Sequence, residues 1–205
     1  MIVSHDLNFE THIDNKTNLA NKIVGLIRRS FSFLDPSSFK KLFCAFVRPH
    51  IEYAHSVWSP FLRRHIDKLE KVQIRATKLV DGLQNLEYGE RLKKCGLTTL
   101  LFRRLRGDMI EAYKHFKTYD QSIIPKTFEV NNRPSRKHDF QLKQKTASDG
   151  TKGIQSNSFY YRIVKSWNSL PSNVVNAPTV NYFKNRLDEH WKDHDLIYST
   201  TAMDL

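Results

Sequence analysis

The stretch from Phe39 to Leu83 constrains the fold most, because its apolar residues recur with the period of an α-helix. Beyond Pro60 they recur at steps of three, four or seven, which places them on one face of a helix with 3.6 residues per turn. These residues are Leu62, Ile66, Leu69, Val72, Leu79 and Val80. Prolines divide the stretch, so we expect two or three helices, with Pro49 ending or kinking one of them near Val47.

A second face of the same helix is basic. Its residues are Arg63, Arg64, Lys68, Lys71, Arg75 and Lys78. A helix of this kind offers an apolar seam to a core and a row of cations to solvent or to a partner. Another set, Arg103, Arg104 and Arg106, falls in the first half of a predicted helix, where cations oppose the helix dipole. These two sets are the candidate nucleic-acid-binding residues, and an ordinary solvated surface is the alternative interpretation.

Periodicity and end signals predict helices elsewhere in the chain as well. Asp35 and Pro36 are typical of a helix start, and Gly82 and Gly96 of helix ends. The expected helices cover residues 11–33, 36–47, 88–94, 98–119, 158–169 and 179–192. Aromatic residues on these faces are expected in the core rather than as platforms for bases. They include Tyr53, Trp58, Tyr160, Tyr161 and Trp167.

We therefore expect a mostly α protein with four regions. A helical bundle covers residues 1–120, and residues 121–157 form a basic linker or a small β-hairpin. C-terminal helices cover residues 158–192, and residues 193–205 form a loose tail.

The charge balance favours a polyanionic partner. The 205 residues carry 33 Lys and Arg against 21 Asp and Glu, a formal net charge of +12. This charge favours nucleic acid first and an anionic membrane surface second, although a merely basic soluble protein has the same composition.

Cys44 and Cys95 lie in apolar contexts that favour reduced core thiols over a disulfide. We find neither a signal peptide nor an apolar run long enough to span a bilayer, so we expect a soluble cytoplasmic or nuclear protein with no membrane partner.

A string of short motifs resembles one family. The segments Arg48-Pro49-His50-Ile51-Glu52-Tyr53, Val57-Trp58-Ser59-Pro60, Leu69-Glu70-Lys71-Val72-Gln73 and Arg75-Ala76-Thr77-Lys78 occur in order. Tyr88-Gly89-Glu90-Arg91-Leu92, the run from Arg103 to Asp108, and Trp167-Asn168-Ser169-Leu170-Pro171 follow. Together they resemble the region downstream of the reverse transcriptase catalytic core in LINE-type, jockey-like non-LTR retrotransposon polyproteins. The resemblance runs from about Leu7 to Trp191 and implies a thumb-like bundle whose basic rows track the phosphates of a template–primer duplex.

The sequence offers no catalytic centre. Nucleotidyl transfer requires paired metal ions held by clustered carboxylates, and no Asp-Asp pair occurs in the chain. By the resemblance, that motif would precede Met1. His190 and His194 alone are too few to indicate a metal site, and no phosphate-binding glycine loop or catalytic triad is present, so we expect no enzyme activity, metal or cofactor.

The functional hypothesis is a retrotransposon-derived fragment that binds RNA, DNA or an RNA–DNA hybrid without sequence preference. One alternative is a protein-interaction or self-association module that uses exposed apolar surface. The other is a genomic remnant without a selected role, since ancestry does not fix function.

Overall fold

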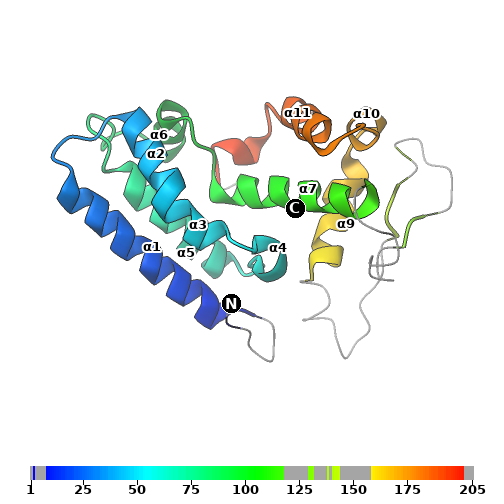
Figure 1. Ribbon diagram of the computed structural model, residues 1–205, viewed down its shortest axis with the longest axis horizontal. Helices are drawn as coiled ribbons and strands as arrows, with labels where there is room; N and C mark the ends of the chain where they lie inside the picture. The colour runs from blue at the N-terminus through cyan, green and yellow to red at the C-terminus, as the bar shows by residue number, and fades with distance from the viewer. Residues whose placement is uncertain are drawn as a thin grey trace. The chain divides into compact units, whose positions relative to one another are not determined.

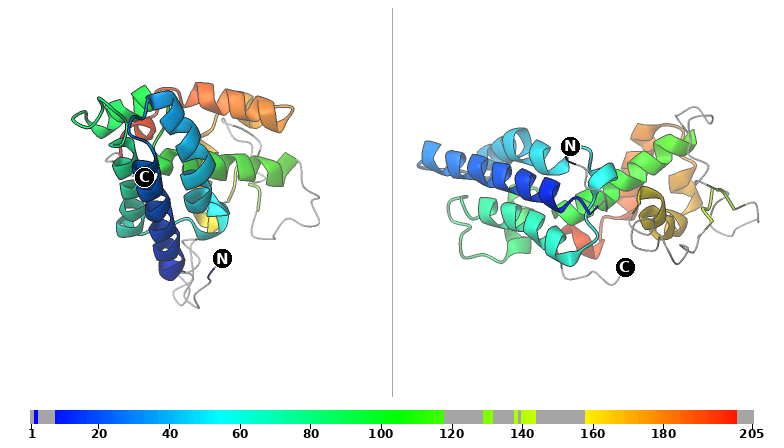
Figure 2. Two further views of the ribbon diagram at one scale, coloured as in Figure 1. Left: turned by 60° about the vertical axis from the view of Figure 1, so that its left-hand side comes forward. Right: turned by 90° about the horizontal axis from the view of Figure 1, so that it is seen from below.

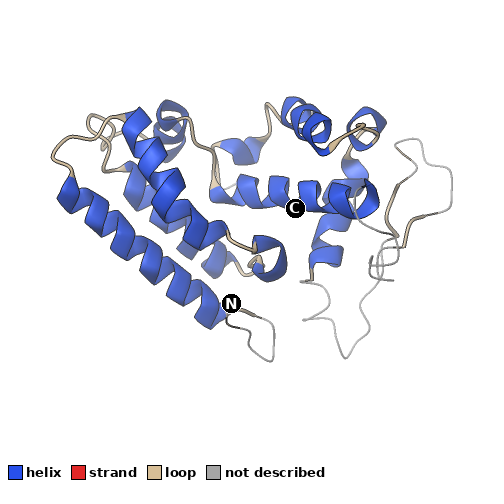
Figure 3. Cartoon of the chain, in the orientation of Figure 1, coloured by secondary structure: helices blue, strands red, loops and turns tan. Residues whose placement is uncertain are grey.

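The structure is a computed structural model that describes residues 2, 8–117, 129–131, 138, 140–143 and 158–200. The described residues are mostly helical, which confirms the predicted fold class, and they contain no strand beyond an isolated antiparallel bridge between Val130 and Leu142 (Figure 3). The chain divides into two compact units. Unit 1 contains residues 1–104 and 195–205, and unit 2 contains residues 105–194. The boundary therefore falls inside a helix, earlier than the predicted boundary at residue 120.

Unit 1 is built around two long helices, α1 and α5. Its elements are α1 (Glu10–Ser30), α2 (Pro36–Leu42), the π-helix η1 (Phe43–Val47), α3 (Arg48–Glu52), α4 (His55–Trp58), α5 (Arg63–Thr77), α6 (Tyr88–Cys95), the start of α7 (Leu100–Lys117) and the 3₁₀ turn η2 (Asp195–Ile197). Helix α1 packs on α5 and also on η1 and α3 (Figures 1 and 2). Helices α1 and α5 run in the same direction, because residues near both N-termini contact each other, as do residues near both C-termini.

The apolar face of α1 only partly enters the core. Ile13, Ala20 and Ile27 are buried, whereas Leu26 remains 56% exposed. The helix ends at Ser30, three residues before the predicted end, and Phe31 has extended backbone. Part of the apolar surface of α1 thus has no cover within the described part of unit 1.

The start of the second helical run follows the prediction. Asp35 caps it, and its Oδ1 accepts hydrogen bonds from the backbone N–H groups of Ser37 at 2.9 Å and Ser38 at 3.1 Å. The hydrogen bonds at Ser38 and Ser37 lower the pKa of Asp35 by stabilising its carboxylate.

Of the two effects predicted for Pro49 near Val47, a helix end is wrong, whereas an irregularity of the helix is present there. The helical run continues through Pro49 to Glu52, and the irregularity is the π-helix η1 just before it. The π turn is wider than an α-helical turn and shifts the register of the residues that follow. Pro49 therefore takes an early position in α3, where the loss of its backbone N–H costs little stability. It also keeps residues at steps of four, Phe39, Phe43, Val47 and Ile51, on one buried face.

Helix α5 and the elements after it agree with the predicted pattern. Ile66, Leu69 and Val72 are buried, and the turn after α5 reaches Gly82 with a φ of 77°. Helix α6 ends at Gly96, whose φ of 59° is a left-handed cap. Thr99 begins α7, since its hydroxyl accepts a hydrogen bond from the N–H of Phe102 at 3.1 Å.

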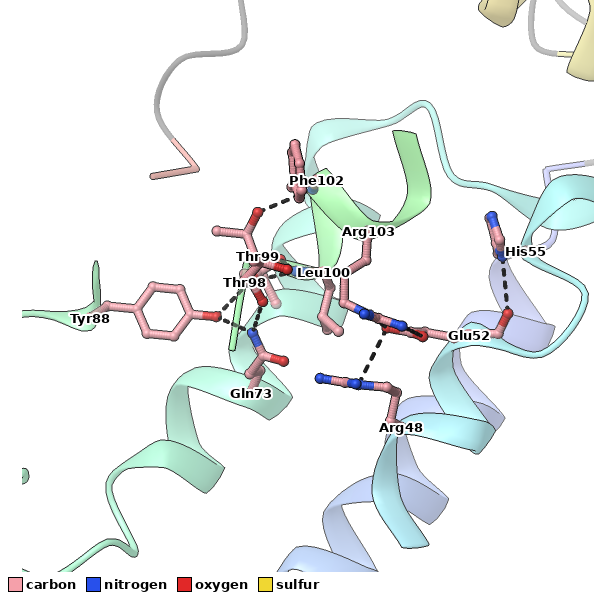
Figure 4. A network of polar contacts seen from close by, with 11 residues as sticks. Arg48, Glu52, His55, Gln73, Tyr88, Thr98, Thr99, Leu100, Phe102 and Arg103 are labelled. Carbon is pink, nitrogen blue, oxygen red and sulfur yellow. Dashed lines mark hydrogen bonds and ion pairs between the residues drawn. The ribbon is translucent and has the colours of Figure 1, made fainter. Parts of the chain in front are cut away.

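A buried polar network ties α5, α6 and α7 together. The hydroxyl of Tyr88 donates to Glu70 Oε1 at 2.5 Å, and the N–H of Leu100 donates to both Glu70 oxygens at 3.1 and 3.2 Å. Gln73 donates to the Tyr88 hydroxyl and to the carbonyl of Thr98, each at 2.9 Å (Figure 4). Glu70, Gln73 and Tyr88 therefore have structural roles in the fold, because they hydrogen-bond one another and the backbone at the start of α7, and only Oε1 of Gln73 is left without a partner among them.

A second polar pair joins α3 to the start of α7. Arg103 donates two hydrogen bonds to Glu52, at 2.5 and 2.9 Å, and Arg48 lies 3.7 Å from the same carboxylate (Figure 4). Both pairing partners belong to the motif string, so this part of the string also holds the fold together.

The described helices of unit 2 are the rest of α7, α9 (Phe159–Ser169), α10 (Ser172–Val175) and α11 (Val180–His190). Its core is aromatic, with Tyr113 stacked on Phe183 at a centroid distance of 4.4 Å and Trp167 packed near both Phe116 and Phe183. Asn168 exchanges hydrogen bonds of 2.8 and 2.9 Å with the backbone of Leu142. This exchange attaches the bridged residues to α9.

Two further predictions need correction. The tail after Asp193 is not loose up to Thr200, because Leu196 and Ile197 are buried and the N–H of Thr99 donates to the carbonyl of Ile197 at 2.9 Å. Among the aromatic residues expected in the core, Trp58, Tyr160 and Trp167 are buried, Tyr161 is half-buried, and Tyr53 is 75% exposed, so the expectation is wrong for Tyr53.

Most of the predicted linker or hairpin over residues 121–157 lies outside the described residues.

Candidate nucleic-acid interface

The first half of the α5 basic row is neutralised by carboxylates. Arg63 pairs with Asp67 one turn along the same helix at 2.9 Å. Arg64 lies 3.4 Å from Glu10 of α1, and Lys68 forms an ion pair with Asp14. These three cations are at the surface, but their charge is already offset, so they contribute less to an anion-binding field than the sequence suggests.

The second half of the row differs. Lys71, Arg75 and Lys78 are exposed, and none of them forms an ion pair with another described residue. Their charges are therefore available to a partner.

Helix α1 adds three cations beside this second half. Arg28, Arg75 and Lys78 line one hollow of about 710 Å³, together with Asn21, Val24, Gly25, Leu79 and Gln84. Lys22 and Arg29 line a neighbouring hollow of about 520 Å³, with Asn18, Asn21 and Gly25. We call the five cations Lys22, Arg28, Arg29, Arg75 and Lys78 the α1–α5 basic surface. All five are exposed, and none pairs with a carboxylate of the described chain.

The remaining lining of these hollows is uncharged. It supplies the side-chain amides of Asn18, Asn21 and Gln84, which both donate and accept hydrogen bonds. Gly25 lines both hollows and leaves their shared wall without a side chain at that position. No aromatic residue is among the lining residues of either hollow. The surface is thus suited to an extended polyanion with polar groups, and it offers no ring on which a base would stack.

The second predicted set does not form a basic surface. Arg103 is bound by Glu52, as described above, and Arg106 donates to both oxygens of Asp188 at 2.5 and 2.7 Å. Arg104 is only 3% exposed, so its assignment to a solvent-facing row is wrong. Arg103 and Arg106 are thus paired within the chain and Arg104 is buried, so none of the three belongs to the candidate site.

Sequence reasoning missed the contribution of α1. The sequence indicates only ordinary polar positions of an amphipathic helix at Lys22, Arg28 and Arg29, or cations that interact favourably with the dipole at the C-terminal end of that helix. In the structure, Arg28 shares a hollow with Arg75 and Lys78, and the other two cations line the hollow next to it. Their recurrence around Gly25, at steps of three and four, is the only sequence signal, and it does not reveal that α5 lies alongside.

Other chemistry has little support among the residues that the structure describes. These residues contain no group of three or more His, Cys, Asp or Glu side chains placed to hold a metal ion. Cys44 and Cys95 are both free thiols, and burial raises the pKa of Cys95 to about 11, which keeps it protonated at neutral pH.

No described helix combines the length and the apolar character needed to cross a bilayer. Comparison with protein-family models, curated proteins and solved structures gives no match to the chain.

Proposed function

We propose that this protein binds a nucleic-acid duplex through phosphate contacts made by the α1–α5 basic surface. The observation that carries the proposal is the gathering of five exposed cations from two helices around adjoining hollows, without carboxylate partners in the described chain. Lys and Arg side chains that contact phosphates release condensed counterions, which drives binding without reading the sequence.

The composition of the surface favours a duplex over a single strand. Proteins that bind single strands stack bases on aromatic side chains, and the lining of both hollows contains none. The amides of Asn18, Asn21 and Gln84 are able to hydrogen-bond phosphate oxygens or the 2′-hydroxyl groups of an RNA strand. An RNA–DNA hybrid presents both kinds of group along a regular backbone.

The family resemblance supports the same proposal. The motif string resembles the part of LINE-type reverse transcriptases that follows the catalytic core, where a helical thumb would hold the template–primer duplex. We propose that the chain derives from such a polymerase and retains the duplex-holding role without nucleotidyl transfer, acting in the cytoplasm or the nucleus. The chain has no Asp-Asp pair to hold the metal ions of that reaction.

Fluorescence anisotropy with three labelled probes of equal length tests this preference. We expect an RNA–DNA hybrid to bind at least as tightly as duplex DNA, and single-stranded RNA to bind at least about tenfold more weakly, because each duplex turn presents more phosphates and the surface lacks stacking groups. A preference for single-stranded RNA at the same salt concentration would refute the proposed mode of binding.

A further inference from the structure

A second surface of α1 is apolar and lies next to α2 and η1. Leu26 and Phe31 on one side and Phe46 on the other border a hollow of about 500 Å³, and Ile23 and Leu42 line its interior. The three bordering side chains are 56%, 45% and 57% exposed. A soluble protein rarely gathers large apolar side chains around a hollow unless something covers them.

The geometry of the second helical run explains why Phe46 is exposed. The π turn η1 keeps Phe43 and Val47 on the buried face, with both at 0% exposure. Phe46 then lies on the neighbouring face and turns toward the hollow. Single-turn π segments occur frequently at functional sites. In this one, Phe46 is exposed beside the hollow and not part of the core.

The charges around the hollow are of one sign. The residues that line it include no Asp or Glu. Lys22 and Arg29 are exposed and lie one helical turn before and after Leu26 on α1. Lys41 is exposed and lies one turn before Ala45, which lines the hollow. The apolar hollow is therefore flanked by cations on both of its helical walls.

We propose that this hollow is the docking site for an amphipathic helix of another protein, with an apolar face and acidic flanks. The apolar face would fill the hollow as in other helix-in-groove complexes, and the flanking carboxylates would pair with Lys22, Arg29 and Lys41. A second copy of this chain is a poor occupant, because it would bring the same basic rim, and the chain carries a net charge of +12. The apolar hollow shares no lining residue with the two α1–α5 hollows, although its flanking cations Lys22 and Arg29 also belong to the basic surface. The proposal does not depend on nucleic-acid binding.

Synthetic helical peptides of about four turns test the proposal with the full-length chain. Each peptide carries Leu and Phe at helical spacing on one face, and the flanking positions carry Glu in one series and Lys in the other. We expect the Glu-flanked peptides to bind in an anisotropy assay and the Lys-flanked peptides to bind at least about tenfold more weakly. Leu26→Ser combined with Phe46→Ser should weaken the Glu-flanked complex by at least about tenfold, because both side chains lose apolar contact with the peptide.

The matched control replaces Tyr53 and Val57 by Ser, since these apolar side chains are also more than half exposed and do not line the hollow. It should leave peptide binding unchanged. The proposal is overturned if no Glu-flanked peptide binds, if both series bind equally, or if light scattering shows a dimer that Phe46→Ser abolishes. Arg75→Glu with Lys78→Glu, which alters the α5 wall of the basic surface, should leave peptide binding intact, so failure of this proposal and failure of duplex binding are distinguishable.

Discussion

Reversing three cations of the α1–α5 basic surface should reduce affinity for an RNA–DNA hybrid by about 100-fold or more at about 0.1 M salt. The variant combines Arg28→Glu, Arg75→Glu and Lys78→Glu, whose side chains line one hollow. Each lost phosphate contact removes about 0.9 from the slope of log Kobs against log salt, so three lost contacts flatten the slope by about three. Anisotropy titrations of both proteins across a series of salt concentrations measure the change in affinity and in slope.

The control must change the net charge equally. Lys41→Glu, Lys94→Glu and Lys165→Glu provide this, because all three lysines are exposed and line neither hollow of the basic surface. This control variant should lose less than about tenfold in affinity, since it changes the long-range field but not the contacts. Equal losses in both variants would mean that binding depends on overall charge and that the α1–α5 basic surface is not the site.

Replacing Glu70 by Ala should destabilise unit 1 by about 3 kcal/mol or more. Glu70 is 2% exposed, and its carboxylate accepts hydrogen bonds from Tyr88 and from the N–H of Leu100. Without it, these buried donors lose their acceptor and the nearby charge of Arg104 loses an attractive carboxylate. Urea denaturation followed by circular dichroism measures the loss of unfolding free energy.

The size of this loss should depend on pH. Burial raises the pKa of Glu70, although the bond from Tyr88 and the charge of Arg104 oppose the shift. When the pKa of a carboxyl group is higher in the folded state than in the unfolded state, the group adds most to the free energy of unfolding below its unfolded pKa of about 4.3. This added stability is lost as the pH rises through the folded pKa. Glu70→Ala should therefore cost more at pH 5 than at pH 8.

Glu90→Ala is the matched control for this experiment, because Glu90 lies on α6 but is exposed. Its effect should stay within about 0.5 kcal/mol at both pH values. A loss for Glu70→Ala no larger than that of Glu90→Ala would contradict a structural role for the buried network.

Helical periodicity and end signals predicted most elements of this fold. The cap at Asp35 and the glycine end at Gly96 follow from local chemistry alone, because each satisfies backbone groups within its own helix. The π turn before Pro49 was not predictable in this way. It depends on packing four side chains spaced four residues apart against the rest of unit 1, which is a tertiary requirement.

The candidate site was predicted less well, for a physical reason. Periodicity identifies which residues of α5 share a face, but it does not show which carboxylates will lie opposite them. Glu10 and Asp14 neutralise the first half of the row only because α1 runs parallel to α5. The same arrangement adds Arg28 to the second half, and Arg104 is lost from the predicted set because α7 turns it inward.

The most direct test of the central claim is a salt titration of hybrid binding by the unmodified protein. We expect log Kobs to fall linearly with log salt, with a slope of about −4 to −5 if the five cations of the α1–α5 basic surface each contact a phosphate. Tight binding that does not change between low and high salt would contradict phosphate-driven binding, and absence of binding at low salt would contradict a nucleic-acid partner altogether.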